Sequence, residues 1–195
     1  QFFIMVMLLG IYVFDVKIGN SPFVLTRNEL VGPIFSQPDY LSFIKDGVGL
    51  NILLRNYWMV IHPPILFLGF ASTIVPFAFA YAGMSTKKFG DWVKPALPWT
   101  LFSCGVLGIG IMMGAKWAYE SLSFGGYWAW DPVENASLVP WMVMIAGLHC
   151  MAIYNATGNS LKASFVFVIL TNAFVLYSTF LTRTGILGDT SVHSF

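Results

Sequence analysis

Charged side chains are scarce in this sequence. They make up only 10% of its 195 residues, whereas a soluble domain carries roughly 25%. The chain therefore lacks the charge needed to cover a surface that faces water, and its 57% hydrophobic content indicates that the lipid bilayer is its solvent. Because the net charge is only +1, the sequence offers neither a basic field for nucleic acid nor an acidic tail.

Cysteine is also rare. Only Cys104 and Cys150 are present, and both lie in apolar stretches. Without a CxxC pair the sequence has no candidate redox pair or zinc cluster, and without CxxCH it is not itself a c-type cytochrome. Two small buried side chains are the simplest interpretation.

Features of a complete chain are missing at both ends. The sequence begins at Gln1 inside an apolar run and ends at Phe195 without a polar tail, so we expect it to be part of a longer protein. The first run lacks the basic start and the small-residue cleavage site of a signal peptide.

Long apolar stretches are what the sequence has in abundance. A membrane-spanning helix needs roughly 20 such residues. We predict an all-α, polytopic transmembrane helix bundle with about five spans and an outward-facing aromatic segment over 116–140. The expected domains are a truncated helix over 1–16, an external loop over 17–59 and a core with four transmembrane helices over 60–195; the predicted spans are 1–14, 60–84, 97–119, 138–156 and 163–181.

The short loops predict the orientation. The loop over 85–96 holds three lysines against Asp91 alone, and Lys162 lies in the turn before the last span. The positive-inside rule makes this side cytoplasmic. The aromatic segment, the first loop and the C-terminal tail then face outward, and their own basic residues are spread more thinly and balanced by acids.

Aromatic side chains gather in one outward segment. An aromatic belt at the membrane interface would scatter them over several helix ends. Here they surround Gly125 and Gly126, which let the backbone approach a flat ligand closely. We therefore favour a platform for such a ligand over a plain belt; its candidate members are Trp117, Tyr119, Phe124, Tyr127, Trp128, Trp130 and Trp141.

Asp131 and Glu134 permit two interpretations. Two nearby carboxylates could perform acid–base catalysis. The run Asp131-Pro132-Val133-Glu134 is also typical of a helix start, with Asp131 as N-cap and Glu134 completing a capping box. We favour the capping role for both residues.

The three histidines point to haem. His62 opens the second span and His193 follows the fifth, so the predicted topology puts both on the face of the aromatic platform. Two imidazoles that flank an aromatic shelf can supply both axial ligands of a haem iron. Arg183 or Lys116 could pair with the propionates, or either could simply anchor a helix end at the interface.

His149 differs because it lies inside the fourth span. An ionisable residue at membrane depth is costly and points to function. It could ligate a second, buried haem with a partner ligand outside this sequence, or make a hydrogen bond within the bundle.

Four motifs together resemble a known family. The run GGYWAWDPVENAS (125–137) looks like the tryptophan-rich WWD motif of the haem-handling superfamily. With VIHPPILFLG (60–69), GAKWAY (114–119) and TSVHSF (190–195), it resembles the cytochrome c maturation protein F family, the membrane core of the bacterial and mitochondrial haem lyase. The sequence departs from that family at Phe124 and Tyr127, where tryptophan is common, and at Ala129, where a larger aromatic is common.

The resemblance implies functional roles for single residues. His62 and His193 match the family's two outward ligands of a transient haem b at the WWD segment. His149 matches one of two ligands of a permanent haem b, whose second ligand lies downstream in the family. Residues expected at the haem-binding segment are Trp117, Gly125, Gly126, Trp128, Trp130, Asp131 and Arg183.

The resemblance also implies partners and a location. It implies a haem lyase component that presents reduced haem to the CxxCH thiols of apocytochrome c. The implied partners are a haem chaperone, apocytochrome c, thiol-handling lyase subunits and quinol, in membrane lipid. The implied location is the bacterial inner membrane with a periplasmic functional face, with the mitochondrial inner membrane as the alternative.

Three alternatives remain open from the sequence. A haem exporter or chaperone-loading member of the same superfamily would use the same outward residues, although it has no obvious use for His149. A secondary transporter would be expected to have inverted repeats and broken helices, and none is visible in the sequence. A structural scaffold would bind no chromophore.

Overall fold

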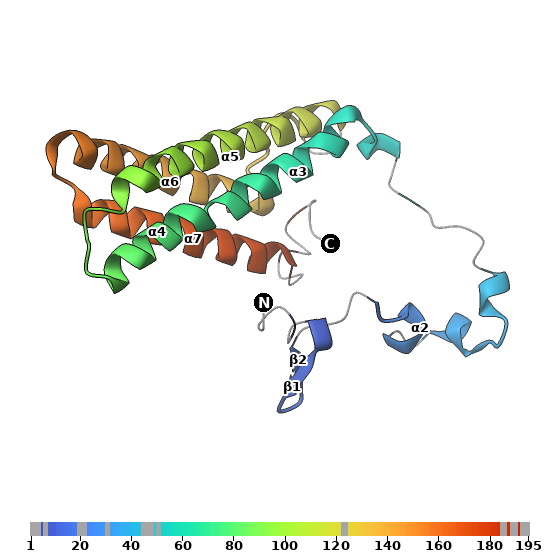
Figure 1. Ribbon diagram of the computed structural model, residues 1–195. Coiled ribbons are helices and arrows are strands. Elements are labelled where there is room, and N and C mark those ends of the chain that lie inside the picture. The colour runs from blue at the N-terminus through green and yellow to red at the C-terminus, as the bar shows by residue number, and fades with distance from the viewer. Residues whose placement is uncertain are drawn as a thin grey trace. The chain divides into compact units, whose positions relative to one another are not determined.

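The computed structural model describes residues 5, 8–18, 23–29, 32–43, 49, 52–121, 125–183, 187 and 191. The chain divides into two compact units, Gln1–Gly49 and Leu50–Phe195. The larger unit holds the long helices and is drawn from cyan to red in Figure 1.

The smaller unit contains an antiparallel hairpin. Strand β1 (Ile11–Val13) pairs with β2 (Val16–Ile18), with Val13 opposite Val16 across a two-residue turn. Phe14 starts that turn with a φ of +54°, as primed hairpin turns require. The helix predicted over 1–14 is therefore wrong at residues 11–13, where β-branched residues and the turn outweigh the apolar pattern. The unit also holds α2 (Thr26–Glu29), η1 (Pro33–Ser36) and η2 (Tyr40–Ser42).

The larger unit is a bundle of long apolar helices. Among the described residues, four helical segments are long and apolar enough to cross a membrane, one fewer than predicted. The predicted membrane helix bundle is thus confirmed. Its elements are η3 (Ile52–Leu54), α3 (Tyr57–Ser72), α4 (Ile74–Ser85), α5 (Val93–Ser121), α6 (Pro132–Thr157) and α7 (Leu161–Arg183).

The first of these spans is broken at Thr73, between α3 and α4. Pro76 has no N–H to offer the carbonyl of Ser72, and a proline ring crowds the carbonyl four residues earlier. The hydroxyl of Thr73 donates to the carbonyl of Phe70 at 2.7 Å, a local bond that often accompanies bent helices. The sequence predicted this span as one continuous helix.

Helix α3 packs closely along α5, as Figure 1 shows. A Cβ added at Gly69 would lie 2.7 Å from Leu107 Cα, and one at Gly110 would lie 2.9 Å from Leu66 Cα. Small residues of this kind let helix backbones approach in membranes, where apolar burial cannot drive association. The pairing fixes the end of α3 that carries His62 against α5.

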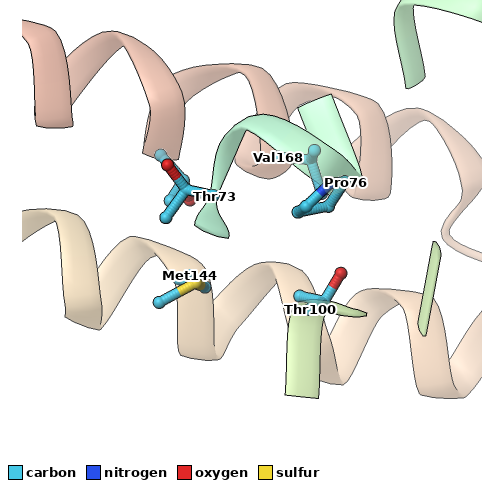
Figure 2. Close-up of a pocket in the computed structure, with 6 residues that line it drawn as sticks. Thr73, Pro76, Thr100, Met144 and Val168 are labelled. Carbon is cyan, nitrogen blue, oxygen red and sulfur yellow. The ribbon is translucent and has the colours of Figure 1, made fainter. Parts of the chain in front are cut away.

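Three threonines meet at the centre of the bundle. Thr73, Thr100 and Thr171 surround a space too small for a water molecule, and Figure 2 shows Thr73 and Thr100 around it with Pro76 and Met144. Each hydroxyl donates to a carbonyl of its own or the adjoining helix. We therefore regard this layer as packing rather than a binding site.

Candidate functional site

Three residues of α5 contact His62 at one end of the bundle. Its Nδ1 lies 2.8 Å from the carbonyl oxygen of Gly110 on α5. A Cβ added at Gly114 would lie 2.6 Å from His62 Cε1, so only glycine leaves room for the imidazole. Trp117, one turn further along α5, has its indole 5.9 Å from the His62 ring.

The hydrogen bond of His62 has a chemical consequence. A carbonyl oxygen can only accept, so Nδ1 carries the proton in the bond to Gly110. The neutral ring then has its lone pair on Nε2, and a backbone carbonyl on the other nitrogen is the usual way in which proteins orient a metal-binding histidine. In a neutral His62 ring, Nε2 is therefore the atom that could bind a metal.

Trp117 has a second role at this end. Its Nε1 donates to the carbonyl oxygen of Leu54 at 3.0 Å, which ties η3 to α5. The indole thus connects the segment before α3 to the His62 site. This long-range bond, across 63 positions, could not be inferred from the sequence.

The aromatic segment after α5 presents two indoles. Trp128 and Trp130 contact each other edge to face, with ring centroids 6.2 Å apart. Trp130 is 70% exposed and has a φ of +57°, an uncommon value for a bulky residue. Gly125 and Gly126 have φ values of +80° and +129°, a backbone region that favours glycine.

Asp131 starts α6 as predicted. Its side chain accepts the N–H of Val133 at 2.9 Å, and the side chain of Glu134 accepts the N–H of Asp131 at 3.2 Å. The capping box is therefore confirmed. The Oδ1 of Asp131 also accepts the hydroxyl of Ser191 at 2.7 Å, and both residues are buried.

The contact of Ser191 with Asp131 predicts an effect on the tail. Ser191→Ala should speed amide hydrogen exchange at position 191 about tenfold or more, because a hydrogen bond to a charged group is worth about 1.5–3 kcal/mol. Hydrogen–deuterium exchange read by mass spectrometry checks this. Ser137→Ala is the matched control, since its hydroxyl bonds only within α6, to the carbonyl of Glu134. Equal exchange in both variants would contradict the prediction.

His149 lies on the outer face of α6. Its Nδ1 is 2.8 Å from the carbonyl oxygen of Ile145, so Nε2 again carries the lone pair. The ring is exposed, on the opposite side of the helix from the buried residues Met144 and Met151. His149 lies about 27 Å along α6 from Asp131, at 1.5 Å per residue. It is therefore not part of the His62 site.

Other predicted residues are dispersed. His193 and Phe124 lie outside the described residues. Arg183 is the last residue of α7. Trp141 is not part of the platform, because its Nε1 donates to the carbonyl oxygen of Cys104 at 2.9 Å and joins α6 to α5. Lys116 pairs with Glu120 at 2.9 Å.

The glycines that contact His62 were not predicted from the sequence to be part of its site. Gly110 and Gly114 form a Gly-x-x-x-Gly pattern, a known signal of close helix packing in membranes. The pattern could have been found, although nothing in it indicates that the packing partner is a histidine. No group of three or more histidine, cysteine or acidic residues that could hold a metal occurs in the described parts of the chain.

Comparisons with known proteins agree on one family. The model of the family described as "Cytochrome C assembly protein" matches residues 2–187. The cytochrome c-type biogenesis protein CcmF of Pseudomonas aeruginosa is 42% identical over 151 residues, which cover 77% of this chain and 23% of that protein. CcmF of Haemophilus influenzae is 40% identical over 181 residues, which cover 92% of this chain and 27% of that protein.

One solved structure is similar as well. It is named "Cytochrome c Heme Lyase CcmF", with a TM-score of 0.62 and 40% identity over 77% of this chain and 26% of that one. The chain thus spans about a quarter of the length of the relatives it matches.

Proposed function

Because this chain belongs to the cytochrome c assembly protein family and matches its CcmF members, we propose that it binds haem for covalent attachment to apocytochrome c. The observation that supports the proposal is the position of His62: its Nδ1–H bonds to the Gly110 carbonyl oxygen at 2.8 Å, which would leave Nε2 as the ligand to iron. The proposed site is the end of the bundle where α3 begins and α5 ends.

His193 is proposed as the second ligand of this haem. Two residues before it, Ser191 donates to the buried Asp131 at 2.7 Å. That bond ties the chain leading to His193 to the start of α6, beside Trp130. A pair of histidine ligands would hold the iron from both faces.

The aromatic segment would hold the porphyrin plane. Trp117 lies beside His62, and Trp128 and Trp130 form an edge-to-face pair. Gly125 and Gly126 provide the backbone turn that carries them. Lys116 is engaged by Glu120 at 2.9 Å, and Arg183 is the proposed partner for a propionate.

His149 would ligate a second, permanent haem b. Its Nδ1–H is held by the carbonyl of Ile145, which again directs Nε2 outward. The apolar residues Met142 and Ile153 are exposed on the same face, so a lone imidazole there needs a partner from outside the described bundle. This agrees with a second ligand elsewhere in a longer protein.

The chemistry divides between haem and protein. The bound haem supplies vinyl groups, and each adds one cysteine S–H of the CxxCH motif to form a thioether, without net oxidation. The residues of this chain would bind the haem, orient its edge toward the thiols and exclude water from the site. Reduction of the iron beforehand would come from the His149 haem, with quinol as the electron source.

The protein is also proposed to have a defined orientation in the membrane and defined partners. We place the His62 end on the periplasmic side of the bacterial inner membrane, with residues 17–59 as an external loop, because Lys87, Lys88 and Lys94 lie at the opposite end of α5 or beyond. A haem chaperone, apocytochrome c and thiol-handling lyase subunits would meet the protein at the His62 end.

Absorption spectra of the full-length protein test the proposal. In His62→Ala and His193→Ala we expect the outer haem signal to fall on the order of 10–100-fold, while the His149 signal remains. In His149→Ala we expect the b-type signal to disappear and the outer one to remain. Four colourless proteins, or four identical spectra, would overturn both haem assignments.

A further inference from the structure

Trp130 is the most exposed of the tryptophans in the aromatic segment, and its backbone is in the left-handed region. Its φ is +57° and its side chain is 70% exposed. Bulky residues avoid this region unless the surroundings fix them there, and such residues gather at functional sites. Something in the fold must therefore hold Trp130 in place.

The holding groups are the side chains of Glu134 and Asn135. One carboxylate oxygen of Glu134, Oε2, accepts the N–H of Ala129 at 3.1 Å and the N–H of Asp131 at 3.2 Å. The Nδ2 of Asn135 donates to the carbonyl oxygen of Trp130 at 3.0 Å. One backbone group of each of the residues 129–131 is thus bound by two neighbouring residues of α6.

The arrangement exceeds what helix capping requires. A capping box needs only the bond from Asp131 N–H to Glu134. The bond to Ala129 lies outside the helix, and the bond from Asn135 acts on the residue before the N-cap. The Asn135 bond acts on the Trp130–Asp131 peptide group, directly after Trp130, and the bond to Ala129 acts on the Trp128–Ala129 peptide group, one residue before it. Together they hold the backbone around Trp130.

We infer that Glu134 and Asn135 are positioning residues that set the orientation of the Trp130 indole toward haem. The inference rests on the proposed function, because it assumes that the indole faces haem. With its backbone held, the indole meets Trp128 edge to face, and this pair would offer the porphyrin a surface of fixed shape. Fixing the pair before haem arrives would lower the ordering cost of binding.

The decisive variant is Asn135→Asp in the full-length protein. It replaces the donor with a carboxylate that repels the Trp130 carbonyl, while an acidic residue in the first turn suits the helix dipole, so α6 should persist. Asn155→Asp, exposed near the other end of α6, is the matched control for charge. For Glu134, Ala removes both bonds, whereas Gln keeps an acceptor oxygen and should restore function.

Two readouts are needed. Protein labelled with 5-fluorotryptophan gives a ¹⁹F resonance for Trp130, assigned by Trp130→Phe, that reports its conformation without haem. Haem titration gives the affinity. We expect Asn135→Asp and Glu134→Ala to move the resonance and weaken haem binding about tenfold, the scale of one aromatic contact, with Asn155→Asp and Glu134→Gln near wild type.

An unmoved resonance in Asn135→Asp would overturn the inference. So would a moved resonance with haem affinity kept within about twofold, since one tenfold step is the smallest effect expected. A wild-type protein that takes up no haem would instead overturn the proposed function, and the role toward haem with it, while the ¹⁹F spectra would still decide whether the two residues set the conformation of Trp130.

Discussion

Replacing Gly114 with alanine is expected to remove haem from the His62 site without unfolding the protein. The new Cβ would lie 2.6 Å from His62 Cε1 and 3.1 Å from both ring nitrogens. The imidazole can rotate away, because it is the end of a side chain, but it then loses the bond to the Gly110 carbonyl. We expect haem affinity at this site to fall on the order of 10–100-fold, close to the effect of His62→Ala.

The matched control is Gly105→Ala on the same helix. A Cβ at Gly105 would meet nothing within 4 Å, so the substitution should leave both haem signals intact. The measurement is the difference spectrum of the purified protein, in which the His149 signal reports folding. If Gly114→Ala kept a normal absorption signal for the haem at the His62 site, glycine at position 114 would not be needed to position the His62 imidazole.

Gly69→Ala is expected to act on stability instead. Its new Cβ would lie 2.7 Å from Leu107 Cα and 2.9 Å from Leu107 N. These neighbours are backbone atoms, which cannot turn aside, so α3 and α5 must separate. We expect the free energy of unfolding to fall by about 1–3 kcal/mol, the usual cost of overpacking.

Unfolding in a mixed detergent series, followed by circular dichroism, measures this loss. Gly105→Ala again serves as control, and it should be neutral or stabilise by about 0.5–1 kcal/mol because alanine favours helix. Gly69→Ala is thus expected to weaken the bundle, whereas Gly114→Ala is expected to displace the His62 side chain. Equal stability of Gly69→Ala and Gly105→Ala would show that α3 and α5 are not packed as closely as described.

Much of the bundle could be predicted from the sequence. Apolar length marks the four spans because the bilayer imposes it, and the run from Asp131 to Glu134 marks the start of α6 because capping uses neighbouring residues. The hairpin at residues 11–18 was missed because a short apolar run fits helix and strand alike.

The residue types of the candidate site could be proposed from the sequence, but their contacts could not. The histidines and tryptophans stand out as costly or unusual residues. Their partners do not, since the Gly110 carbonyl is 48 positions from His62 and Ser191 is 60 from Asp131. Contacts at such separations depend on how helices pair, which local patterns do not encode. The left-handed backbone conformation of Trp130 could not be predicted from the sequence either, because glycine is the residue that usually indicates it.

The break at Thr73 has a mechanical consequence. On one side, α3 is wedged against α5 through Gly69 and carries His62. On the other, α4 contributes Ala80 to a different core with Val168 of α7. A joint that lacks the Pro76 backbone bond is softer than a continuous helix, so it absorbs tilting of the α4 segment. We therefore expect the first span to move as two coupled rods, so that strain entering through α4 is only partly passed to the segment of α3 that carries His62.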